Sequence, residues 1–179
     1  GSGGDEGGVV EGGSEDLTGG NVNVGRAGGD AGNRLNASKG HDTLNGGAGA
    51  DSLVGGNGGD TADYSASAAA VTANLAAGTA SGGDAQGDVL VGIENLIGGN
   101  GNDTLTGDGG DDLLLAPGAG GLVVAGGAGS DTLSFAAATA GVSLTLNQAV
   151  SSIETLIGSS LDDRLAAIGA TAVAIDGGN

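Results

Sequence analysis

Two consecutive nine-residue units decide the fold of this chain: GGAGADSLV at 46–54 and GGNGGDTAD at 55–63. Each has a Gly-rich start, an Asp at position six and a small aliphatic residue at position eight. The same frame extends back through GGDAGNRLN at 28–36 and ASKGHDTLN at 37–45, and resumes with GGNGNDTLT at 98–106. A fixed period over consecutive units indicates a repeat architecture.

Positions six and eight carry the periodic signal. Position eight returns an aliphatic side chain, the expected inward strand residue, at Leu17, Leu35, Leu44, Leu53, Ala62, Leu96, Leu105, Leu114, Leu133 and Leu165. Position six forms an oxygen-ligand column of Asp42, Asp51, Asp60, Asp103, Asp112, Asp131 and Asp163, with Asn33, Glu15, Glu94 and Glu154 as variants. Because glycine permits positive φ and the last three residues include a β-former, each unit predicts a tight turn followed by a short strand.

This pattern, Gly-Gly-x-Gly-x-Asp-x-aliphatic-x, resembles the RTX (hemolysin-type) calcium-binding nonapeptide repeat. The resemblance covers most of the chain apart from two insertions. It implies that two units complete one coil and that Ca²⁺ lies between turns stacked one coil apart. We therefore expect an all-β protein: a parallel β-roll, or β-solenoid, of nonapeptide repeats with two inserted strand–loop segments.

The composition agrees with a long, narrow core. Of 179 residues 43 are Gly, one is Tyr and one is Phe, and Trp, Met and Cys are absent, which excludes a large aromatic core. Asp and Glu number 22 against 4 Lys and Arg, so the net charge of −18 disfavours nucleic acid as a partner and favours a cation. Without Cys and with one His, the available ligands are carboxylates and backbone carbonyls, the hard oxygens that suit Ca²⁺.

The expected ligands follow from the length of one coil, 18 residues. Asp42 and Asp60 satisfy that spacing, and Asn33 with Asp51 predicts a weaker site because one charge is lost. The complete set of candidate metal ligands is Asp42, Asp60, Asp51, Asn33, Asp112, Asp131, Glu94, Asp103 and Asp163, with the turn glycines Gly47, Gly49, Gly56 and Gly58.

The C-terminal half offers a second competent stretch. Glu94 and Asp112 are 18 residues apart, and Asp112 and Asp131 are 19 apart. Asp103 is expected to be incomplete, because one coil behind it the spacing predicts Ala85 and one coil ahead Leu122. We expect few calcium ions, concentrated at residues 42–60 and 94–131.

Two related segments interrupt the ladder. Each begins with an aromatic, Tyr64 or Phe135, and returns through a similar phrase, GIENLIG at 92–98 or SIETLIG at 152–158. TASGGDAQGD at 79–88 is predicted to be a surface loop. The predicted segments of one continuous solenoid are a roll over 1–63, an insertion over 64–88, a roll over 89–134, a second insertion over 135–148 and a roll over 149–179.

No catalytic constellation is found. His41 is the sole His and Cys is absent, so we expect a non-enzymatic chain. No apolar run approaches the roughly 20 residues of a membrane span, and the start GSGGDEGG lacks the features of a signal peptide. The final DGGN stops where another repeat would start, which indicates a piece of a longer protein.

The leading functional hypothesis is a calcium-stiffened structural segment of a secreted or cell-surface protein, of adhesin-stalk, surface-layer or filament type. The resemblance further implies type I secretion from a bacterium as an unfolded chain. The alternative is an accessory module of a secreted hydrolase or polysaccharide-active enzyme. An ice-binding solenoid is disfavoured by irregular outer positions, and open roll ends predict end-to-end self-association.

Overall fold

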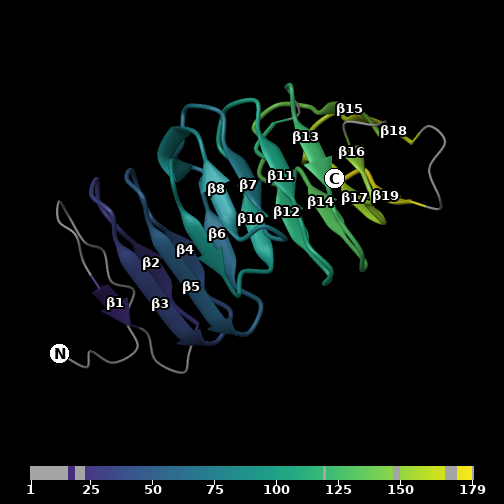
Figure 1. The fold of residues 1–179 in the computed structure, drawn as a ribbon. Helices are drawn as coiled ribbons and strands as arrows, with labels where there is room; N and C mark the ends of the chain where they lie inside the picture. Colours follow the sequence, from purple (N-terminus) through teal and green to yellow (C-terminus); the bar gives the residue numbers. More distant parts are fainter. Residues whose placement is uncertain (1–15, 19–22, 119, 147–149, 168–172, 179) are drawn as a thin grey trace.

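The computed structural model describes residues 16–18, 23–118, 120–146, 150–167 and 173–178. The described residues form short strands joined by turns, with one 3₁₀ turn, η1 (Gly83–Ala85). The strands lie side by side along an elongated molecule, broadly in chain order (Figure 1). The predicted all-β parallel roll is confirmed.

Most strands belong to two sheets. The eight-stranded sheet has the spatial order β19 (Ala174–Asp176), β17 (Thr155–Ile157), β14 (Thr132–Ser134), β12 (Leu113–Leu115), β10 (Asn95–Ile97), β6 (Thr61–Asp63), β4 (Thr43–Asn45) and β2 (Gly25–Ala27). The nine-stranded sheet has the order β1 (Asp16–Thr18), β3 (Arg34–Lys39), β5 (Ser52–Asn57), β9 (Val89–Val91), β8 (Thr79–Ser81), β7 (Thr72–Asn74), β11 (Thr104–Thr106), β13 (Val123–Ala125) and β16 (Val150–Ser151). A separate pair is formed by β15 (Ser143–Leu146) and β18 (Arg164–Ala167).

The strand register shows how the chain coils. Thr43 of β4 lies beside Thr61 of β6, and Arg34 of β3 lies beside Ser52 of β5. Both steps are 18 residues, and the strands from β1 to β6 and again from β9 to β14 alternate between the two sheets. One coil therefore consists of two nonapeptides, with one strand contributed to each sheet.

The core is the space between the two sheets. Position-eight side chains fill it, and those fully removed from solvent include Leu35, Leu44, Leu53, Leu96, Leu105, Leu114, Leu133 and Leu156. Each such burial is worth about 1.5–3 kcal/mol relative to exposure. In each three-residue strand the middle side chain points inward and its two neighbours point outward. Each strand therefore contributes one side chain to the interior.

The first insertion lies within the nine-stranded sheet. After β6 the chain forms β7, returns antiparallel as β8, and then forms β9 against β5. The prediction of a surface loop over 79–88 is therefore wrong for residues 79–81, which form β8, while the rest of the segment contains η1 and turns. Ala80 is buried in the middle of β8, and Gly78, with φ of +66°, permits the tight turn that joins β7 to β8.

The second insertion begins in the same way but is shorter. Tyr64 and Phe135 donate equivalent backbone hydrogen bonds, to the carbonyls of Ile97 and Ile157, each at 2.9 Å. Here β15 pairs with β18 in the two-stranded sheet, and β16 resumes the nine-stranded sheet beside β13.

Candidate metal sites

The position-six residues form two columns, one along each sheet, at the point where turns lead into strands. In most members one carboxylate oxygen accepts a hydrogen bond from the backbone N–H of the position-six residue one coil earlier; Asp112, which accepts from Asp108 in its own turn, is an exception. Oδ1 of Asp42 accepts from Val24 at 2.7 Å, and Oδ1 of Asp60 accepts from Asp42 at 2.8 Å. Oδ1 of Asp51 accepts from Asn33 at 2.7 Å. The candidate ligands are thus anchored by the backbone of the neighbouring coil.

The second carboxylate oxygen of these residues is left without a partner. The atoms concerned are buried and accept no hydrogen bond: Oδ2 of Asp42, Asp51, Asp60 and Asp131, and Oδ1 of Asp112. A buried acceptor without a partner costs about 1–3 kcal/mol, and more when charged. Five such atoms at the same repeat position indicate that the missing partner is a cation.

Backbone carbonyls of the neighbouring coil lie close to the carboxylates of the column. A Cβ atom at Gly55 would collide with the carbonyl oxygen of Gly92 and lie 2.5 Å from Oδ2 of Asp60. A Cβ atom at Gly107 would collide with the carbonyl oxygen of Gly126 and with Oδ2 of Asp112. Glycine at position one therefore lets a carbonyl of one coil and a carboxylate of another come together. Carbonyl and carboxylate oxygens that lie close together are ligands that suit Ca²⁺.

The turn glycines proposed as ligands sit where the predicted turns require them. Gly47 and Gly56 have φ of +83° and +113°, and a Cβ atom on Gly56 would collide with the carbonyl oxygen of Ser38. Gly49 and Gly58 also have positive φ and pack on the turn of the preceding coil. The turns therefore stack closely, backbone on backbone.

Glu94 occupies a shortened turn. The buried inward residues Leu90 and Leu96 are six residues apart, whereas Leu53 and Ala62 on either side of the turn of Asp60 are nine apart. Oε2 of Glu94 accepts from the backbone N–H of Asp60 at 2.8 Å, and Oε2 of Glu154 accepts in the same way from Asp131. The Glu side chain, which is longer than that of Asp, spans the extra distance that the shorter turn leaves between the two coils. Glu94 also acts on Asp112 through its negative charge.

The carboxylates at 112 and 131 repeat the arrangement seen at 42 and 60. Oδ1 of Asp131 accepts from the backbone N–H of Asp112 at 2.9 Å, and Oδ2 of Asp112 accepts from the N–H of Asp108 at 2.8 Å. Both Asp112 and Asp131 are buried. The structure thus brings together the pair that the 19-residue spacing selects.

Asp103 has a different neighbour from the one expected. Its Oδ1 accepts from the backbone N–H of Val71 at 2.9 Å, while Ala85 lies in η1. The predicted alignment with Ala85 is wrong because β7, not the segment before β9, pairs with β11. One coil ahead the register places Leu122, as expected.

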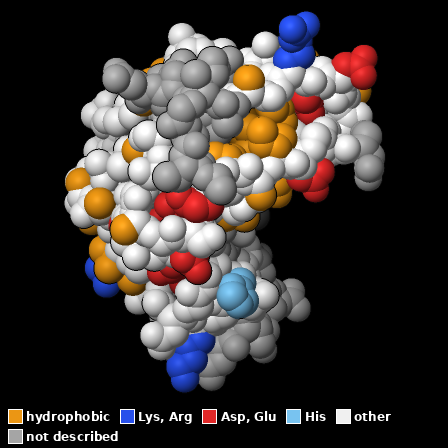
Figure 2. Space-filling model, turned by 90° about the vertical axis from the view of Figure 1, so that its right-hand side faces the viewer, with side chains coloured by type: hydrophobic (Ala, Val, Ile, Leu, Met, Phe, Trp, Pro, Cys, Tyr) orange, Lys and Arg blue, Asp and Glu red, His pale blue; other side chains and the backbone are white. Residues whose placement is uncertain are grey.

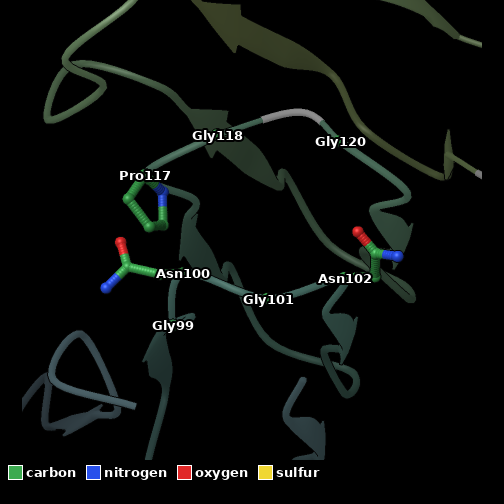
Figure 3. A pocket seen from close by; sticks show the side chains of 7 residues that line it. All are labelled: Gly99, Asn100, Gly101, Asn102, Pro117, Gly118 and Gly120. Carbon is green, nitrogen blue, oxygen red and sulfur yellow. The ribbon is translucent and has the colours of Figure 1, made fainter. Parts of the chain in front are cut away.

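The turn before Asp103 borders a cavity of about 170 Å³. Figure 3 shows Asn100 and Asn102 on one side and the Pro117–Gly118 loop on the other. None of the described lining residues carries a carboxylate. The described residues one coil ahead of Asp103 that line this cavity therefore offer no second carboxylate for a metal ion.

Asp163 is satisfied by hydrogen bonds. Oδ1 accepts from the N–H of Val142 at 2.7 Å and from the hydroxyl of Ser159 at 2.8 Å, while Oδ2 accepts from the N–H of Ser159 at 2.6 Å. The hydrogen bond from Val142 is the main reason that the pKa of Asp163 is lowered. Unlike the buried column, neither of its oxygens lacks a partner.

Sequence reasoning missed one column member, Asp88. Its Oδ1 accepts from the backbone N–H of Asp51 at 2.8 Å, which is the position-six contact. The signal was present in GDAQGDVLV at 83–91, with Asp at position six and Leu90 at position eight. Asp88 falls at the end of the predicted insertion over 64–88, because the predicted roll resumes only at residue 89.

Burial opposes ionisation along the columns. Desolvation is the largest cause that raises the pKa of Asp51, Asp60, Asp103 and Asp131, and it raises the pKa of Asp112 to about 6. Neighbouring carboxylates raise the pKa of Asp60, Asp112 and Asp131 further. At neutral pH these groups carry charge at a cost that a bound cation would relieve.

The column is not a cluster of acidic side chains. Among the described residues no three His, Cys, Asp or Glu side chains gather into a group that could hold a metal. On the face drawn in Figure 2 the visible Asp and Glu side chains also lie in small separate groups. A metal here must take much of its coordination from carbonyls. The part of the chain that the structure describes also has no helix long and apolar enough to cross a membrane.

The comparison with protein families agrees with this geometry. The RTX calcium-binding nonapeptide repeat matches in four copies, over residues 27–62 and 90–116. No curated protein matches the chain as a relative. The matched ranges contain the anchored carboxylates at 42, 51, 60, 103 and 112. Residues 27–62 and 90–116 are therefore RTX calcium-binding nonapeptide repeats, a structural repeat that binds Ca²⁺.

Proposed function

We propose that the chain is a calcium-dependent structural segment of a secreted or cell-surface protein, of the adhesin-stalk, surface-layer or filament type, and that it folds when Ca²⁺ binds. The observation that carries the proposal is the set of five buried carboxylate oxygens without partners, all at one repeat position. A structural role fits a molecule whose core runs its whole length and whose one recurrent chemical feature is this column.

Each site in this proposal lies between two stacked turns. One lies between the turns of Asp42 and Asp60, and one between the turns of Asp112 and Asp131. Asn33 and Asp51 form a weaker site, because an amide replaces one carboxylate. Carbonyls of the turns, including those of Gly47, Gly49, Gly56 and Gly58, complete the coordination, while Glu94 contributes its free carboxylate oxygen to the site of Asp60.

Charge makes such folding conditional on the metal. Stacked coils repeat at about 4.8 Å, so carboxylates in one column repel strongly unless a divalent ion lies between them. Metal binding to a site that forms only in the folded state contributes directly to folding free energy. At extracellular millimolar calcium the sites fill, whereas below micromolar calcium the chain, with a net charge of −18, stays extended.

This switch supports the proposed location. A chain that stays unfolded at intracellular calcium is suited to export by type I secretion and to folding outside the cell. Asp103 and Asp163 are then anchoring residues of the ladder that contribute less to metal binding. In the filament type, self-association end to end would follow folding, and light scattering in millimolar calcium tests it.

Circular dichroism during a calcium titration tests the proposal, with magnesium as the control. We expect strand content to rise cooperatively with calcium and to be lost on addition of a chelator. Magnesium should be far less effective, because it demands a regular octahedral shell that a ladder of carbonyls does not supply. Equal strand content in chelator and in calcium would contradict the proposal.

A further inference from the structure

Asp88 is a buried position-six residue whose second carboxylate oxygen has a side-chain partner within the protein. Like the other column members, it is buried and accepts a backbone N–H through Oδ1, here from Asp51. Its Oδ2, however, accepts a hydrogen bond from the hydroxyl of Tyr64 at 3.0 Å. The corresponding atoms of Asp42, Asp51 and Asp60 have no partner at all.

The topology explains why a side chain is needed at this point. Ahead of β9 in the sheet lies the antiparallel strand β8, so no parallel coil stacks on the turn of Asp88. The next coil would have supplied the carbonyl oxygen that accompanies a carboxylate elsewhere, as Gly92 does beside Asp60. Calcium coordination between stacked turns therefore cannot be completed at Asp88.

Tyr64 is held firmly in place to make this contact. Its side chain is 2% exposed. Its backbone N–H donates to the carbonyl of Ile97 at 2.9 Å, and its carbonyl accepts from the N–H of Ser67 at 2.9 Å. The hydroxyl therefore reaches Asp88 from the other end of the insertion, closing the segment 64–88 on itself.

The second insertion carries a matched substitution. Phe135 has the same backbone hydrogen bond to the returning strand, at 2.9 Å, and is fully buried, but it has no hydroxyl. Asp88 stands four residues before GIENLIG, and the residue four before SIETLIG is Gln148. Tyr thus goes with a carboxylate in one copy, and Phe goes with a neutral amide in the other.

We infer that the Tyr64 hydroxyl takes the place of a metal ion at Asp88, where the antiparallel strand β8 leaves calcium coordination incomplete, and that it joins the two calcium-binding stretches by a metal-independent contact. The inference rests on the proposed function, since it assigns Asp88 a different role from the carboxylates at 42, 60, 112 and 131.

Calorimetric calcium titration and thermal unfolding in calcium test the inference on four variants of the full chain. Tyr64→Phe and Asp88→Asn should each bind as many calcium ions as the wild type. Tyr64→Phe should lower the Tm by roughly 3–8 °C, because Asp88 is left with a buried unpaired oxygen. The double variant Y64F/D88Q, which rebuilds the pair of the second insertion, should recover at least half of that loss.

Asp60→Ala is the comparison, and it should bind one calcium ion fewer, because it removes both carboxylate oxygens. A lost ion in Asp88→Asn, a gained ion in Tyr64→Phe, or a Tm of Tyr64→Phe equal to that of the wild type would each overturn the inference. If Asp60→Ala binds the wild-type number, the site assignment of the proposed function fails. The coupling between Tyr64 and Asp88 is still decided by the Tm of the single and double variants.

Discussion

The two position-six columns differ in continuity. Along the eight-stranded sheet every member from Asp42 to Glu154 is acidic: Asp42, Asp60, Glu94, Asp112, Asp131 and Glu154. Along the nine-stranded sheet the column contains Asn33, Asp51 and Asp88, and then Val71, Asp103 and Leu122. The difference teaches that calcium need not be distributed evenly over the roll. One edge is a nearly unbroken series of carboxylates, and the other depends more on packing and hydrogen bonds.

The largest expected effect comes from removing the charge of one carboxylate in the continuous column, compared with the same change in the interrupted column. Asp131→Asn keeps an oxygen for the N–H of Asp112 but removes the charge on the unpaired oxygen. We expect the calcium midpoint of folding to rise by roughly tenfold or more, as for loss of a metal ligand or its support. Asp103→Asn on the interrupted column should shift it by less than about threefold. Equal shifts, measured by circular dichroism, would contradict the contrast between the columns.

A second test uses two glycines of one turn. Gly107→Ala places a Cβ against Gly126 and Asp112, whereas a Cβ at Gly109 meets nothing within 4 Å. Gly107→Ala should destabilise the calcium-bound protein by about 1–3 kcal/mol, as overpacking does. Gly109→Ala should be neutral or slightly stabilising, because it restricts the unfolded chain. Thermal unfolding in millimolar calcium measures both, and a greater loss at Gly109 would refute close stacking on the continuous column.

The smallest expected effect is a pH dependence, centred on Asp112. Its pKa is raised by burial to about 6 in the fold from an ordinary 3.8, so its ionised form opposes folding above pH 6. That penalty is relieved as the pH falls through 6 and is absent below 3.8. In chelator we therefore expect more strand content at pH 5 than at pH 7.5. With calcium the midpoint should rise at pH 5, because protons compete with the metal; Asp112→Asn should weaken both trends.

The repeat itself was predictable from sequence, because its physical cause is local. Gly at position one, Asp at position six and Leu at position eight each follow from one turn and one strand, and the 18-residue coil follows from two units. Leu44, Leu53 and Leu105 are buried where the pattern places them. The pairing of Asp42 with Asp60 likewise required only the spacing.

What sequence reasoning missed depends on contacts between distant strands. Asp103 meets Val71 instead of Ala85 because the insertion advances along the sheet, turns back as β8 and fills the gap with β9. No local sequence pattern predicts that the chain will run ahead to β7 and then turn back through β8 to β9. Asp88 is the exception, since GDAQGDVLV contains the repeat signature and only the choice of frame concealed it.

The hydrogen bonds of the columns all point in one direction along the chain. The position-six amides of Val24, Asp42 and Asp60 are each capped by a carboxylate that comes later in the sequence, and Val71 and Asp131 follow the same rule. The two ends of the roll are consequently unlike, as in a polar filament. Removing the coil that follows one of these five amides would take away its carboxylate cap, while removing the coil that precedes it would leave the cap in place.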